Sequence, residues 1–308
     1  MTYDVTLQNI TKTYEKGAIK AVKNVSLQIE KGELFGLIGP DGAGKTSIFR
    51  ILTTLLLPDE GMANVNGLDV VSDYKEIRKR VGYMPGKFSL YQDLSVEENL
   101  KFFATLFDTT IEENYDIIKD IYVQIEPFKT RAAGQLSGGM KQKLALCCAM
   151  IHRPSVLFLD EPTTGVDSVS RKEFWNMLKK LKAQGITILV STPYMDEATL
   201  CERIALIQEG EIMSVDTPQN IIDQYPMPLY KVKSDKMSLL LKDLRTLSYV
   251  TSAMSFGEFH HITFNSKTDE SAQLLEDLKH HEKLECLPTR ATVEDCFIHL
   301  MQNNVHAE

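Results

Sequence analysis

The segment at residues 39–46 constrains the fold of this chain most, because it reads GPDGAGKT and fits the pattern G-x-x-x-x-G-K-[ST]. A compact apolar run at residues 34–38 precedes it, and a helical pattern at residues 47–57 follows. Glycines in such a loop let backbone N–H groups turn inward around phosphate oxygens, and the helix N-terminus adds free donors. The segment therefore predicts a strand–loop–helix unit that binds nucleotide phosphates. Lys45 would reach the β- and γ-phosphates, and the Thr46 hydroxyl would bind Mg²⁺.

Two further apolar runs, at residues 156–159 and 186–190, have the length of strands that are buried on both faces. Shorter strands are indicated at residues 5–7 and 25–29. Because strands and helices alternate, we expect an α/β fold with a mostly parallel sheet and helices on both sides. A helical subdomain is expected at about residues 87–150, with helices at residues 97–107, 114–125 and 140–151.

The pattern changes after a stretch punctuated by Pro218, Pro226 and Pro228. We therefore expect a nucleotide-binding domain at residues 1–225 and a small accessory α+β domain at residues 226–308. The elements expected in the second domain are a strand from about residue 229, helices at residues 238–247, 271–280 and 293–301, and strands at residues 249–255, 260–265 and 284–288.

Composition and charge exclude several classes of protein. The 308 residues include 34 basic and 42 acidic side chains, and this net charge of −8 argues against a general nucleic-acid-binding protein. No apolar run approaches the roughly 18 residues that cross a bilayer, and no secretory signal is visible. The five cysteines show no disulfide framework. The histidine pairs at residues 260–261 and 280–281 lack the i, i+4 spacing of two ligands on one helix face, so we expect no metal site there.

Two carboxylates, Asp160 and Glu161, follow the apolar run at residues 156–159. The end of a buried parallel strand places them at the edge of the sheet where open α/β folds bind ligands. Asp160 would hold Mg²⁺ through water, and Glu161 could polarise the attacking water as a general base. Two solvated acids that end a strand would have the same pattern, but the nearby phosphate loop favours the catalytic interpretation.

The segment LSGGMKQ at residues 136–142 precedes an apolar helix. Ser137 suits the N-cap position, and the glycines leave backbone donors open at the helix N-terminus. By itself the segment is open to two interpretations, a second anion-binding site or an ordinary capped helix.

Together, the three segments resemble the ATP-binding subunit of an ABC transporter over about residues 3–220. LSGGMKQ resembles the family signature, and residues 164–167 resemble its D-loop, which contains Asp167. Tyr14 stands where the family has an aromatic residue that stacks on adenine; the alternative is a half-buried tyrosine at a strand end. The resemblance implies a catalytic Glu161, nucleotide contacts from Tyr14, Gly39, Pro40, Asp41, Gly42, Ala43, Gly44, Lys45, Thr46 and Ser47, metal contacts from Thr46 and Asp160, and signature contacts from Leu136, Ser137, Gly138, Gly139 and Met140.

Three further stretches, residues 35–40, 90–100 and 291–298, resemble the branch of the family that contains drug- and antibiotic-efflux ATPases. The implied fold is an ABC-type P-loop ATPase with a helical subdomain and a small C-terminal α+β domain. The implied substrate is ATP with Mg²⁺, and the implied activity is ATP hydrolysis coupled to export.

Two positions depart from the family pattern. Gly86 stands where the family has a glutamine that senses Mg²⁺ and the attacking water, and Pro193 stands where it has a switch histidine at the γ-phosphate. Glycine offers no side-chain oxygen, and proline has neither a side-chain donor nor a backbone N–H. Loss of one positioned donor costs on the order of 10²–10³ in rate, so we expect slow hydrolysis at the chain's own site.

The resemblance also implies partners. We expect separate membrane permease subunits, a second ATP-binding subunit in a homodimer or a heterodimer, and no nucleic acid. Such a chain would be cytoplasmic and peripheral on the inner face of the cell membrane. Two alternatives are a soluble ABC ATPase that acts on ribosomes or DNA, and a pseudo-ATPase that only binds ATP.

Overall fold

Three buried apolar runs form the middle of a six-stranded sheet in the computed structural model, which describes residues 2–265 and 269–305. The strand order is β10-β9-β3-β8-β7-β6, and only the pair β10–β9 is antiparallel among the described strands of this sheet. The predicted mostly parallel sheet is therefore confirmed. The strands are β3 (Leu34–Ile38), β6 (Val81–Met84), β7 (Val156–Asp160), β8 (Thr187–Thr192), β9 (Arg203–Gln208) and β10 (Glu211–Asp216).

A second sheet, with the order β2-β1-β4-β5, is antiparallel. Its strands are β1 (Tyr3–Tyr14), β2 (Ile19–Glu30), β4 (Glu60–Val65) and β5 (Leu68–Asp69). The strands expected at residues 5–7 and 25–29 were too short. Pairing between β1 and β2 continues from Tyr3 and Glu30 to Tyr14 and Ile19, through polar and half-exposed residues that an apolar pattern does not detect.

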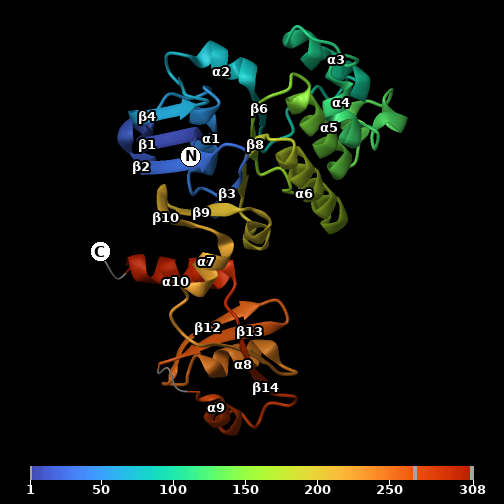
Figure 1. Ribbon diagram of the computed structural model, residues 1–308. Coiled ribbons are helices and arrows are strands. Elements are labelled where there is room, and N and C mark those ends of the chain that lie inside the picture. Colours follow the sequence, from blue (N-terminus) through green and yellow to red (C-terminus); the bar gives the residue numbers. More distant parts are fainter. Residues whose placement is uncertain (1, 266–268, 306–308) are drawn as a thin grey trace. The chain divides into compact units, whose positions relative to one another are not determined.

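The first part of the chain contains six α-helices among the described residues, and Figure 1 shows α3, α4 and α5 grouped on the side of the central sheet away from β1, β2 and β4. This group is the predicted helical region. The helix expected at residues 47–57 begins earlier and ends at Leu52, because Thr54 adopts a left-handed φ of 62°. The helices are α1 (Lys45–Leu52), α2 (Tyr74–Arg80), α3 (Val96–Leu106), α4 (Tyr115–Tyr122), α5 (Gly138–Met150) and α6 (Ser168–Ala183), with short 3₁₀ turns η1 (Glu15–Gly17), η2 (Glu126–Phe128), η3 (Ala133–Gln135) and η4 (Met195–Leu200).

The chain divides into two compact units, Met1–Pro218 and Gln219–Glu308. The second unit contains an antiparallel sheet of order β12-β13-β11-β14, with α8 packed on β12 and β13 and α9 packed on β14. Val232, Ile262 and Leu240 are fully buried in its core. Its elements are α7 (Pro218–Asp223), β11 (Leu229–Lys233), α8 (Met237–Leu244), β12 (Val250–Phe256), β13 (Phe259–Phe264), α9 (Ser271–Asp277), β14 (Glu285–Thr289) and α10 (Val293–Val305).

From β11 onward the predicted order of strands and helices agrees with the structure, and the small α+β fold is confirmed, whereas helix α7 was not predicted. Within residues 2–265 and 269–305, no helix combines the length and the apolar composition that a membrane span requires.

Candidate functional site

The phosphate loop joins the end of β3 to α1, and it holds a buried lysine. Lys45 is 3% exposed, and its Nζ donates hydrogen bonds to the carbonyl oxygens of Gly39, at 2.8 Å, and Pro40, at 2.9 Å. The same Nζ lies 3.2 Å from Oε1 of Glu161. Phosphate oxygens would compete with these acceptors for the ammonium, so the lysine can bind a phosphate group without leaving the loop.

Two glycines of this loop are required by close packing. A Cβ on Gly39 would lie 2.1 Å from the carbonyl oxygen of Ile207 in β9, and a Cβ on Gly44 would lie 2.2 Å from that of Ala21 in β2. Gly44 is also the N-cap residue of α1, with a φ of 102° that side chains disfavour. The loop backbone is therefore held at the N-terminus of α1, where N–H groups are available to an anion.

One serine of β8 fixes the Asp160 carboxylate at the end of β7 and the backbone of Glu161 that follows it. Asp160 is 2% exposed, and its Oδ1 accepts a hydrogen bond of 2.6 Å from the Ser191 hydroxyl. The backbone N–H of Glu161 donates to the carbonyl oxygen of Ser191 at 3.1 Å and to its Oγ at 3.0 Å. The sequence analysis did not predict this role for Ser191; the only signal was a hydroxyl near the end of a buried neighbouring strand.

The donors near the strand end suit a hard divalent cation. Thr46 offers a hydroxyl in the first turn of α1 and Asp160 offers a carboxylate, and Mg²⁺ prefers oxygen ligands of this kind. Burial, together with the Asp160 carboxylate, raises the pKa of Tyr83 to about 12, so its phenol stays neutral beside the acidic strand end. The residues that are present therefore fit Mg²⁺ bound with a nucleotide.

Tyr14, at the end of β1, is brought to the phosphate-loop helix. Its hydroxyl lies 3.0 Å from the Ser47 hydroxyl in the first turn of α1, and its side chain is half-buried. Tyr14 is thus a half-buried tyrosine at a strand end that contacts the phosphate-loop helix, and its contact with a nucleotide base stays a prediction.

The signature segment packs against the D-loop helix. Ser137 caps α5 and accepts a hydrogen bond of 3.4 Å from the Met140 backbone N–H. A Cβ on Gly139 would lie 2.6 Å from Oγ of Ser170 in α6. Asp167 caps α6, and its carboxylate accepts from the N–H groups of residues 169 and 170. Ser137 and Gly138 are exposed, so they remain accessible to a partner.

The two positions that depart from the family pattern lie at or next to the same strand ends. A Cβ on Gly86 would lie 3.1 Å from the carbonyl oxygen of Asp160 and 3.7 Å from Cβ of Glu161. Pro193 directly follows β8, two residues after Ser191. The structure therefore places Gly86 beside residues 160 and 161, and Pro193 at the end of the strand that carries Ser191.

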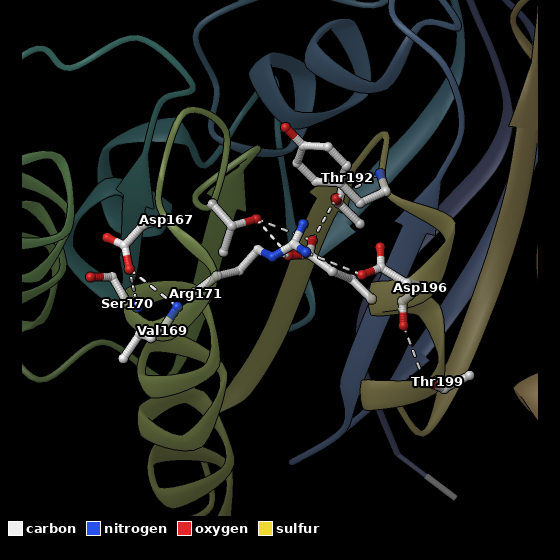
Figure 2. A network of polar contacts seen from close by, with 10 residues as sticks. Asp167, Val169, Ser170, Arg171, Thr192, Asp196 and Thr199 are labelled. Carbon is white, nitrogen blue, oxygen red and sulfur yellow. Dashed lines mark hydrogen bonds and ion pairs between the residues drawn. The ribbon is translucent and has the colours of Figure 1, made fainter. Parts of the chain in front are cut away.

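A buried carboxylate joins the segment after Pro193 to the D-loop region (Figure 2). Glu197, 2% exposed, accepts hydrogen bonds from the Thr192 hydroxyl at 2.6 Å and the Thr163 hydroxyl at 2.8 Å. The Arg171 guanidinium of α6 lies 3.7 Å from Glu197 and 3.2 Å from Asp196. The sequence analysis missed this network, because its members are spread over more than 30 positions of the chain.

The comparisons with known proteins agree with this geometry. The family described as ABC transporter matches residues 22–164. Nod factor export ATP-binding protein I of Burkholderia lata is 33% identical over 300 residues, which cover 96% of each chain. This chain therefore belongs to the family of ABC transporter ATP-binding proteins.

Other relatives match about two thirds of this chain. The probable multidrug ABC transporter ATP-binding protein YbhF of Escherichia coli is 43% identical over 217 residues, which are 70% of this chain but only 38% of that protein's length. The ABC transporter ATP-binding protein NatA of Bacillus subtilis is 36% identical over 215 residues, covering 68% of this chain and 87% of NatA.

Solved structures confirm the ABC-type P-loop ATPase fold. The ATP-binding cassette MJ0796, solved as a dimer in a post-hydrolysis state bound to ADP and Pi, is 30% identical with a TM-score of 0.63, covering 69% of this chain and 98% of that one. CbiO1 of Clostridium perfringens, part of the cbiONQ complex, has a TM-score of 0.65 at 23% identity, covering 73% of this chain and 92% of that one, and this likeness concerns the fold alone.

Proposed function

We propose that this chain is the ATP-binding subunit of an ABC exporter, in which ATP binding and hydrolysis drive a separate membrane permease. One observation carries the proposal: the Lys45 ammonium, the Glu161 carboxylate and the serine-fixed Asp160 meet at the ends of adjacent strands. Relatives named for multidrug transport and Nod factor export support the direction of transport.

Each group at the site has a distinct role in this proposal. Lys45 and the loop N–H groups bind the phosphates, Tyr14 contacts the base, and Glu161 accepts a proton from the attacking water. Thr46 and Asp160 would hold Mg²⁺, which neutralises phosphate charge when it is bound with ATP. The remaining contacts of the phosphate loop, from Gly39, Pro40, Asp41, Gly42, Ala43, Gly44 and Ser47, bind and orient the nucleotide.

Hydrolysis at this chain's own site is slow in the proposal. Gly86 leaves no side-chain oxygen beside the carboxylates, and Pro193 leaves no donor at the switch position. Slow turnover follows because positioned donors at a reacting centre contribute on the order of 10²–10³ in rate.

The exposed signature at Ser137 and Gly138 completes a site on a second ATP-binding subunit. The related cassette MJ0796, solved as a dimer, supports pairing. We favour a heterodimer with one strong and one weak site over a slow homodimer. The reason is that both departures from the family pattern lie at the phosphate-loop site and none lies in the signature. The pair would lie on the inner face of the membrane against its permease, with residues 1–225 as the ATPase domain and residues 226–308 as an accessory domain.

Two other functions compete with this proposal, namely action on ribosomes or DNA, and ATP binding without hydrolysis. The exporter names among the relatives favour transport over the first. The Glu161 carboxylate beside Lys45 favours residual hydrolysis over the second.

The weak site is tested by restoring the missing side chains. We expect Pro193→His, alone and with Gly86→Gln, to raise the ATP turnover of the purified chain by about 10²-fold, because a donor returns to the γ-phosphate. Gly86→Gln requires a small backbone shift, since its Cβ would lie 3.1 Å from a carbonyl oxygen, so the single Pro193→His variant is the cleaner measurement.

Two controls accompany this measurement. Adding Glu161→Gln to either variant is expected to remove the gain, and the affinity for ATP is expected to stay within about threefold of wild type. Fast turnover by the wild-type chain, with no gain from either change, would contradict the weak site but leave the nucleotide-binding function intact.

A further inference from the structure

Two adjacent histidines and one aspartate converge in the C-terminal unit. His280 and His281 lie in the turn after α9, and Asp243 lies in the last turn of α8. The Nε2 atom of His281 is 2.9 Å from Oδ2 of Asp243, and Nε2 of His280 is 3.2 Å from the same oxygen. Two imidazole nitrogens therefore converge on one carboxylate oxygen.

The spacing of these atoms suits a metal ion. One ligand atom from each of the three residues lies within 4.8 Å of the others. Zinc binds imidazole nitrogen at about 2.0–2.1 Å, so two ligand atoms on a tetrahedral ion are about 3.3 Å apart. Small rotations of the side chains would bring the three atoms to that separation.

The burial of the three side chains fits a site with a fixed inner part and an open outer part. The His281 side chain is 1% exposed, Asp243 is 28% exposed and His280 is 57% exposed. The exposed side leaves room for water as a further ligand.

We propose that Asp243, His280 and His281 bind a divalent transition-metal ion of the zinc type, with water in the fourth position. The ion would replace the hydrogen bonds between the histidines and Asp243, and it would join the end of α8 to the turn after α9. Metal binding to the folded state stabilises that state, so zinc would stabilise the C-terminal unit.

The sequence analysis expected no metal at residues 280–281, because two adjacent histidines do not share a helix face. The structure shows why that argument was incomplete. The histidines lie in a turn rather than in a helix. The carboxylate of Asp243 comes from α8, 37 positions before His280 in the chain.

The proposal is tested by titrating zinc into the full chain without nucleotide. Calorimetry measures the binding, and thermal unfolding measures the stability with and without zinc. We expect one zinc ion per chain and a higher midpoint of thermal unfolding in zinc. Asp243→Asn and His280→Ala are each expected to weaken this binding at least roughly 10- to 100-fold, since loss of a group that only orients a metal ligand already has effects of that size. Neither variant removes the buried His281, so both should fold.

His299→Ala is the matched control, because it removes one histidine that contacts Tyr225 in the same unit and leaves the cluster intact. Its zinc affinity should equal that of wild type. Absence of zinc binding by the wild-type chain would overturn the proposal and would leave the cluster as a hydrogen-bonded pair of histidines. Equal affinity in wild type and Asp243→Asn would also overturn it, because the ion would then be held elsewhere.

Discussion

At the scale of single residues, Glu161 combines a constrained backbone with a reactive position. Its φ is 50°, in the left-handed region that few residues other than glycine adopt. Two hydrogen bonds from its N–H to Ser191 hold this conformation, and its carboxylate lies 3.2 Å from the Lys45 ammonium. A strained conformation held in this way at the end of a strand is typical of a functional site.

Glu161→Gln is expected to lower the residual ATP turnover of the purified chain by about 10²-fold or more, because an amide cannot accept the proton of the attacking water. ATP binding should be retained, since Lys45 keeps its loop contacts. Phosphate release and equilibrium binding of labelled ATP measure the two effects separately. The control is Glu112→Gln on the exposed face of the helical region, and equal turnover in both variants would show that Glu161 is not the base.

At the scale of elements, Glu197 links η4 to β8 and α6. Its buried carboxylate is the shared acceptor for Thr163 and Thr192, and it is close to the Arg171 guanidinium (Figure 2). Because Thr163 lies near the D-loop and Thr192 precedes Pro193, one side chain holds the D-loop region and the switch segment together. A movement of the switch segment would therefore also move the D-loop region, because the buried hydrogen bonds join the two.

Glu197→Ala is expected to lower the free energy of unfolding by about 3 kcal/mol, because it leaves the buried Thr163 and Thr192 hydroxyls without their acceptor. Asp196→Ala is the matched control: Asp196 is the neighbouring residue and also bonds Arg171, but its side chain is 67% exposed. That variant should cost less than about 1 kcal/mol. Urea unfolding of the two variants makes the comparison, and similar losses would mean that the buried network contributes little.

The sequence predicted the central strands and the phosphate loop well, because their signals are local. The runs that became β3, β7 and β8 are mostly apolar, and the loop motif lies between its strand and helix as expected. Strand β4 was not predicted, since half of its residues are exposed and its pairing is with β1 far along the chain. Glu197 and the partner of His280 were missed for the same reason: long-range contacts set their environment.

At the scale of the whole molecule, the chain offers two separate half-sites. The phosphate loop with Asp160 and Glu161 is one, and the exposed Ser137 and Gly138 at the start of α5 are the other. The second half-site carries no departure from the family pattern, whereas the first lacks two side chains. In a heterodimer, these two half-sites would make unequal contributions to hydrolysis.

Substitutions in the two half-sites distinguish a heterodimer from a homodimer in the assembled complex, purified through a tag on this chain. In a heterodimer, Ser137→Arg should reduce ATP turnover by roughly 10²-fold, because it disrupts the partner's strong site. Lys45→Ala should have an effect at least about tenfold smaller, because it disables only the weak site. Gln135→Arg, an exposed change two residues before Ser137, is the control and should leave turnover unchanged. Equally large losses from Ser137→Arg and Lys45→Ala would indicate a homodimer, and a larger loss from Lys45→Ala would place the strong site on this chain's own loop.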